Sequence, residues 1–88
     1  MIKVRTSSKY DKDIKKCAKR KLDLKALATV INILKEPSLL PAKNRDHILS
    51  GNYQGYRECH IAPDWLLIYR YVDGCLELYR TGTHADLF

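Results

Sequence analysis

The sequence predicts a small α+β domain with the element order β-α-α-β-β-β. Apolar residues at helical spacing fill much of the first half, and three strand-like runs follow in the second half. An Asp-Gly pair at positions 73 and 74 separates the last two runs, which is a strong hairpin signal. We therefore expect a single domain over residues 1–88, in which an antiparallel meander sheet packs with two N-terminal helices.

The N-terminal elements follow from local patterns. Residues 2–6 alternate apolar and polar side chains, as a short strand does. Three consecutive hydroxyl residues then offer caps for a first helix over residues 8–21, whose outer face is strongly basic. A second apolar stripe predicts a helix that is capped by Asp23 and ends before Pro37.

The second half predicts a loop and three strands. Residues 37–53 are rich in Pro, Asn, Ser and Gly, so we expect a loop there. The runs at 56–61, 66–72 and 75–81 are expected to form the meander. The middle run is nearly continuous in apolar and aromatic residues, which is typical of a central strand.

The two turns of the meander predict a register. If residues 62–65 and 72–75 form tight turns without irregularity, His60, Leu67 and Arg80 lie in one cross-strand row. A one-residue slip would move His60 to the opposite face, so this prediction depends on both turns. Four further residues are expected to crowd one end of the sheet: Asp64, Trp65, Gly82 and His84.

Composition limits the possible partners. Lys and Arg number 16 against 10 Asp and Glu, which gives a formal charge of +6. Such a charge attracts nucleic acid, anionic membrane or an acidic protein. No apolar run is long enough to span a bilayer, and the first residues do not resemble a signal peptide, so a cytoplasmic protein is expected. The three cysteines form no CxxC pair and are expected to be buried thiols: Cys17, Cys59 and Cys75.

Three histidines are the candidate chemical groups: His47, His60 and His84. Imidazole is the side chain best suited to proton transfer near neutral pH, and a cationic surface suggests a polyanionic substrate. A single histidine is nevertheless more commonly structural or merely exposed. Their spacing matches no compact metal-ligand motif, and Cys59 and His60 should point to opposite faces of a strand, so no metal is expected.

Several segments carry a family resemblance: residues 45–47, 49–51, 55–60, 63–69, 80–84 and 87–88. Together they resemble the YafQ-type branch of the RelE/ParE superfamily, the toxin halves of bacterial toxin–antitoxin pairs. The resemblance covers the whole chain in element order and is most specific from residue 46 onward. It implies a RelE-like fold.

The resemblance also implies a function, a ribosome-dependent endoribonuclease that cuts mRNA and needs no metal or cofactor. The implied partners are a cognate antitoxin, the ribosome and mRNA, with operator DNA bound only through the antitoxin complex and no membrane. The functional positions of the branch correspond here to six residues: His47, His60, Asp64, Trp65, His84 and Phe88.

Metal-free RNA cleavage needs a base for the 2′-hydroxyl, an acid for the leaving 5′-oxygen and cations for the phosphorane. We expect His84 to be the acid and His60 to be the base or a phosphate ligand. Asp64 would orient an imidazole or accept a proton, and His47 would complete the site from its loop. The division of roles among the three histidines stays open.

The expected substrate-binding residues are Arg45, Trp65, Arg80 and Phe88. Arg80 would clamp the phosphate with its planar guanidinium, and Trp65 or Phe88 would stack on a base. Structural roles are the alternatives, since Trp65 also suits a core and Arg80 a strand end. Two other functions compete: a non-catalytic ParE-like inhibitor of DNA gyrase and an RNA-binding module without cleavage.

Overall fold

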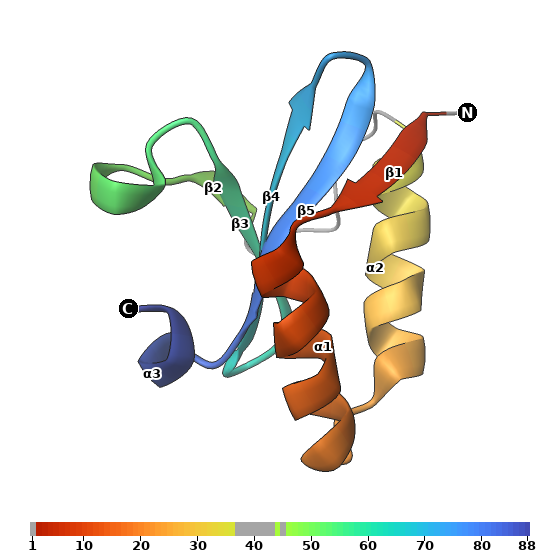
Figure 1. Ribbon diagram of the computed structural model, residues 1–88, viewed down its shortest axis with the longest axis vertical. Coiled ribbons are helices and arrows are strands. Elements are labelled where there is room, and N and C mark those ends of the chain that lie inside the picture. The colour runs from red at the N-terminus through yellow and green to blue at the C-terminus, as the bar shows by residue number, and fades with distance from the viewer. Residues whose placement is uncertain (1, 37–43, 45) are drawn as a thin grey trace.

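The computed structural model describes residues 2–36, 44 and 46–88, and it confirms the predicted α+β class (Figure 1). Two helices of 12 residues each precede the main strands. The elements in chain order are β1 (Lys3–Thr6), α1 (Ser8–Lys19), α2 (Leu24–Lys35), β2 (His47–Ile48), the 3₁₀ turn η2 (Gly51–Tyr53), β3 (Arg57–Ala62), β4 (Trp65–Val72), β5 (Cys75–Gly82) and α3 (His84–Leu87).

Within the described residues, the strands form one five-stranded sheet in the order β1-β5-β4-β3-β2. β3, β4 and β5 make the predicted antiparallel meander, and β1 lies parallel to β5 at the edge. A parallel neighbour requires a crossover, which α1 and α2 provide. Figure 1 shows these two helices on one side of the sheet, and η2 and α3 on the other side.

Both long helices begin at side-chain caps. The Ser7 hydroxyl accepts a hydrogen bond from the Tyr10 N–H, and Asp23 accepts from the N–H groups of Lys25 and Ala26. These bonds satisfy backbone donors that a helix start leaves unpaired. α2 ends at Lys35, before Pro37, as predicted. Among the described residues, no helix is both long and apolar enough to cross a membrane.

The sheet has apolar side chains on both faces. The face beneath α1 and α2 carries the main core, in which Leu67, Tyr69 and Cys59 are fully or almost fully buried. On the opposite face, Leu66 and Ile68 form a smaller cluster with Leu87 of α3. β4 is therefore buried from both sides, which explains its continuous apolar run.

Two irregularities make the predicted cross-strand row wrong. Ala62 faces Trp65 and Val72 faces Cys75, as expected at the two turns. The register then shifts between His60 and Ala62, so that His60 faces Leu66 rather than Leu67.

A second shift lies between β4 and β5. Tyr69 faces Leu78 but Ile68 faces Arg80, so Tyr79 is the extra residue and Leu67 faces Thr81. A bulge adds one residue to one strand and changes every pairing beyond it. His60 and Arg80 therefore do not share a row.

Candidate active site

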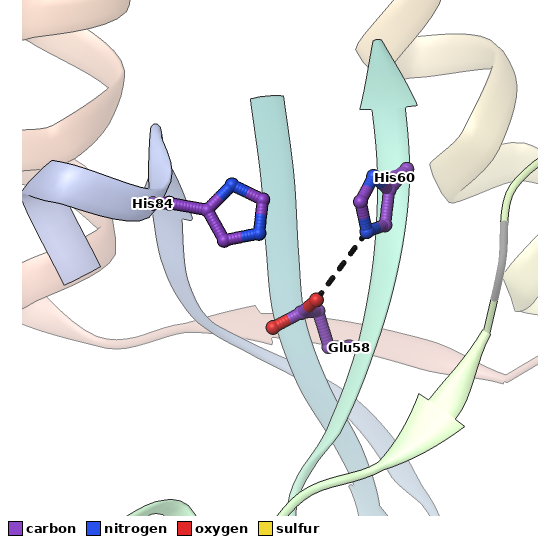
Figure 2. A group of neighbouring side chains, drawn as sticks. All are labelled: Glu58, His60 and His84. Carbon is purple, nitrogen blue, oxygen red and sulfur yellow. Dashed lines mark ion pairs between the residues drawn. The ribbon is translucent and has the colours of Figure 1, made fainter. Parts of the chain in front are cut away.

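The candidate site lies on the sheet face opposite α1 and α2. Glu58 and His60 are two apart on β3, so their side chains point to the same face. His84 opens α3, directly after β5. Figure 2 shows its imidazole facing the other two side chains, and the His60 and His84 ring centroids lie 5.8 Å apart. The structure thus brings His60 and His84 together and adds a carboxylate beside them.

Glu58 is the residue that sequence reasoning missed. Its side chain is only 5% exposed, and its Oε1 lies 3.5 Å from His60 Nε2 and 3.6 Å from His47 Nε2. A carboxylate this buried needs partners, which the two imidazoles supply. The signal in the sequence was its position two residues before His60, which puts both side chains on the same face of the strand.

His47 lies on β2 and not on an unstructured loop. It pairs with Glu58 across the β2–β3 ladder, and its side chain is about half exposed. The prediction that this histidine completes the site from a loop is therefore wrong about its setting. The short strand holds its imidazole beside Glu58 before any substrate arrives.

Asp64 orients His84. Its Oδ1 accepts the His84 backbone N–H at 3.0 Å and lies 2.7 Å from Nδ1 of the imidazole. Both contacts lower the pKa of Asp64 below its usual value, and the hydrogen bond from the backbone N–H has the larger effect. An ionised carboxylate only accepts hydrogen bonds, so Nδ1 carries the proton and Nε2 is the nitrogen left for a substrate.

Phe88 lies beside His84 at the end of the chain, and it is 64% exposed. Its ring centroid is 6.4 Å from that of His84 and 5.3 Å from that of Tyr53. The Tyr53 hydroxyl also donates to the Leu87 carbonyl at 2.8 Å, which ties α3 to η2. An exposed aromatic ring next to a proton-transfer group suits stacking on a nucleobase.

Two other predicted substrate-binding residues, Arg80 and Trp65, are bound to partners within the fold. The Arg80 guanidinium donates to Asp13 of α1 at 2.7 and 3.1 Å. These two hydrogen bonds use the Nε and Nη2 donors that we expected to bind a phosphate. The expectation that Trp65 stacks on a base does not fit, because the residue is 3% exposed and its indole N–H donates to Thr81. Arg45 lies outside the described residues.

Glu58, His60 and His84 could together hold a metal ion, since their ligand atoms all lie within 4.8 Å of one another. Imidazole nitrogens and a carboxylate oxygen are ligands that Zn²⁺ and Cu²⁺ accept. Cys59 takes no part, because it is buried in the core on the helix side. The same three groups therefore suit either proton transfer or metal binding.

Comparison with known proteins identifies the family. Residues 2–88 match the family model described as bacterial toxin of type II toxin-antitoxin system, YafQ. This chain belongs to the YafQ toxin family. The mRNA interferase toxin YafQ of Escherichia coli (strain K12) is 46% identical over 83 residues, which cover 93% of this chain and 90% of that protein.

Solved structures of YafQ-family toxins and a related toxin have the same fold. In the crystal structure of the E. coli DinJ-YafQ toxin-antitoxin complex, the matching chain has a TM-score of 0.90 and 43% identity, covering 99% of this chain and 97% of that chain. A metal-bound toxin from Helicobacter pylori has a TM-score of 0.93 and 41% identity, with 100% of both chains covered. The family resemblance read from the sequence is confirmed.

Proposed function

We propose that this YafQ-family toxin is an mRNA interferase, a metal-independent endoribonuclease that cuts messages on the ribosome and so inhibits translation. The observation that carries the proposal is the convergence of a buried carboxylate and two imidazoles on the sheet face opposite α1 and α2. Such a set can remove one proton and deliver another, which is what cleavage by a 2′-hydroxyl requires. The names of the E. coli relatives support the same activity.

Glu58 is the proposed base. The carboxylate takes the proton of the 2′-hydroxyl while the 2′-oxygen bonds to the adjacent phosphorus. His60 and His47, whose Nε2 atoms both lie near Glu58 Oε1, donate hydrogen bonds to the phosphate oxygens on which charge develops. This assignment gives His60 the phosphate role rather than that of the base.

His84 is the proposed acid. As the bond from phosphorus to the 5′-oxygen breaks, Nε2 of the imidazolium gives its proton to that oxygen. Asp64 holds the ring through Nδ1 and so keeps Nε2 directed away from Asp64. The products are a 2′,3′-cyclic phosphate on one fragment and a 5′-hydroxyl on the other. Phe88 stacks on a base beside the scissile bond.

The partners follow from the relatives. YafQ of E. coli has been crystallised in complex with DinJ, so we infer that a cognate antitoxin neutralises this toxin and that operator DNA is bound through that complex. The substrate places the toxin in the cytoplasm, where messages are translated. Its formal charge of +6 favours association with ribosomal RNA and mRNA.

Purified toxin added to ribosomes on a defined message should create new 5′ ends, which primer extension detects. The same message without ribosomes should be cut far more slowly, because so small a site needs the ribosome to position its substrate. Glu58→Gln keeps the size of the side chain and removes the base, so we expect the new ends to disappear. Arrested translation without new 5′ ends would contradict the proposal and favour a non-cutting inhibitor.

Metal ions provide a second arm of this assay. Because the proposed chemistry uses side chains alone, excess EDTA should leave the cleavage rate unchanged. Added Zn²⁺ or Cu²⁺ should inhibit, since a bound ion would occupy the atoms of Glu58, His60 and His84 that transfer or bind protons. Loss of activity on chelation, with recovery on adding the ion, would contradict metal-independent cleavage.

A further inference from the structure

Arg20, the C-cap residue of α1, is hydrogen-bonded to the short helix that carries His84. Its Nη1 donates to Asp86 Oδ2 at 2.6 Å and its Nη2 donates to Oδ1 at 3.1 Å. This is a bidentate arginine–carboxylate pair, which fixes the orientation of the carboxylate as well as adding electrostatic stabilisation. The two residues are 66 positions apart, so the pair joins distant parts of the chain.

Asp86 is in turn hydrogen-bonded to the first turn of α3, so Arg20 is connected to that turn through Asp86. Its Oδ2 accepts the Thr83 backbone N–H at 3.0 Å, and its own N–H donates to the Thr83 hydroxyl at 3.1 Å. His84 is the first residue of the helix that this reciprocal capping box starts. Movement of Asp86 would therefore move the backbone from which the His84 imidazole projects.

Charge and packing both hold Asp86 in place. The Arg20 hydrogen bonds, followed by the Thr83 N–H, keep the pKa of Asp86 far below its usual range, so the carboxylate is ionised at neutral pH. Gly82 leaves room for it, since a Cβ there would lie 2.8 Å from Asp86 Oδ2. A helix of four residues has no stability of its own and depends on such contacts.

We propose that Arg20 is a positioning residue of the nuclease, which holds α3 so that His84 faces Glu58 and His60. The inference rests on the proposed function, in which His84 is the acid. Asp64 and Tyr53 hold the same segment from the β3–β4 turn and from η2. Of Asp64, Tyr53 and Arg20, only Arg20 connects α3 to a long helix of the main core. This connection fixes the position of α3 relative to the core.

Arg20→Ala should lower kcat about 10- to 100-fold in the ribosome assay, because small displacements of a catalytic group are costly. Lys19→Ala is the matched control, since it removes the same charge from the adjacent position. Any loss of general attraction to RNA raises KM in both variants, whereas only Arg20→Ala should lower kcat. Arg20→Lys, which can keep one of the two hydrogen bonds, should recover part of the loss.

Amide hydrogen exchange provides a local readout. In Arg20→Ala the amides of residues 84–88 should exchange faster, while those of β4 keep their protection. Asp86→Asn retains an oxygen that can cap Thr83 but removes the charge that Arg20 holds. In that background, adding Arg20→Ala should lower kcat little further, as expected when two residues act through one contact.

Equal kcat values for Arg20→Ala and Lys19→Ala would overturn the positioning role. His84→Ala in the same assay separates this failure from a failure of the proposed function. If His84→Ala loses cleavage while Arg20→Ala keeps the wild-type kcat, only the role of Arg20 is wrong. If His84→Ala also cleaves at the wild-type rate, the assignment of the acid is wrong, and the role of Arg20 falls with it.

Discussion

His84→Gln should reduce kcat for ribosome-bound message by about 10²- to 10⁴-fold, the usual contribution of a general acid. Glutamine can keep a hydrogen bond to Asp64 but cannot deliver a proton to the leaving oxygen. KM should change little, because His84 acts mainly in the transition state. Initial rates of cleavage of a defined message on purified ribosomes, measured over a range of ribosome-complex concentrations, give both quantities.

Ala85→Gln is the matched control for this change. It places the same amide at the next position of α3, where the side chain is exposed. We expect it to cleave within about threefold of the wild-type rate, since a surface substitution of this kind perturbs the fold little. A His84→Gln enzyme that cleaves as fast as this control would show that another group protonates the 5′-oxygen.

Of the substitutions proposed here, Asp13→Ala should lower the free energy of unfolding most, by about 2–4 kcal/mol. The Asp13 side chain is 11% exposed and accepts two hydrogen bonds from Arg80 and one from the Thr81 N–H. Its removal leaves a half-buried guanidinium and a buried amide without their partner. For a domain of this size the midpoint of thermal unfolding should fall by about 8–30 °C.

Asp11→Ala is the comparison for stability, because it removes the same charge from an exposed position of α1. Its effect should stay below about 0.5–1 kcal/mol, the value of one carboxylate near a helix N-terminus. Urea unfolding followed by circular dichroism gives both free energies. Similar values for the two variants would mean that the Arg80–Asp13 pair contributes no net stability.

Most of the elements were predictable because each of them depends on local signals. The caps at Ser7 and Asp23 and the Asp73-Gly74 turn lie where the sequence placed them. α3 was missed because four residues are too few to show a period. The edge strand β2 was missed for the same reason, since only two of its residues pair.

The site was predictable only in part, for reasons that lie in tertiary structure. Counting residues from the turns predicts the register only if the strands pair without interruption. Ile61 and Tyr79 are extra residues that shift the register, so the count failed. The pairing of Arg80 with Asp13 joins residues 67 apart, which no local pattern reveals. Glu58 became visible as a functional candidate only when its burial between two histidines was known.

The chemical ends of the cut message test the central claim most directly. Fragments from a single cleavage on the ribosome can be analysed by mass spectrometry. Attack by the 2′-hydroxyl with Glu58 as base and His84 as acid predicts a 2′,3′-cyclic phosphate, or its hydrolysed 3′-phosphate, together with a 5′-hydroxyl. A 5′-phosphate with a free 3′-hydroxyl would show that activated water attacks instead, and would contradict the account.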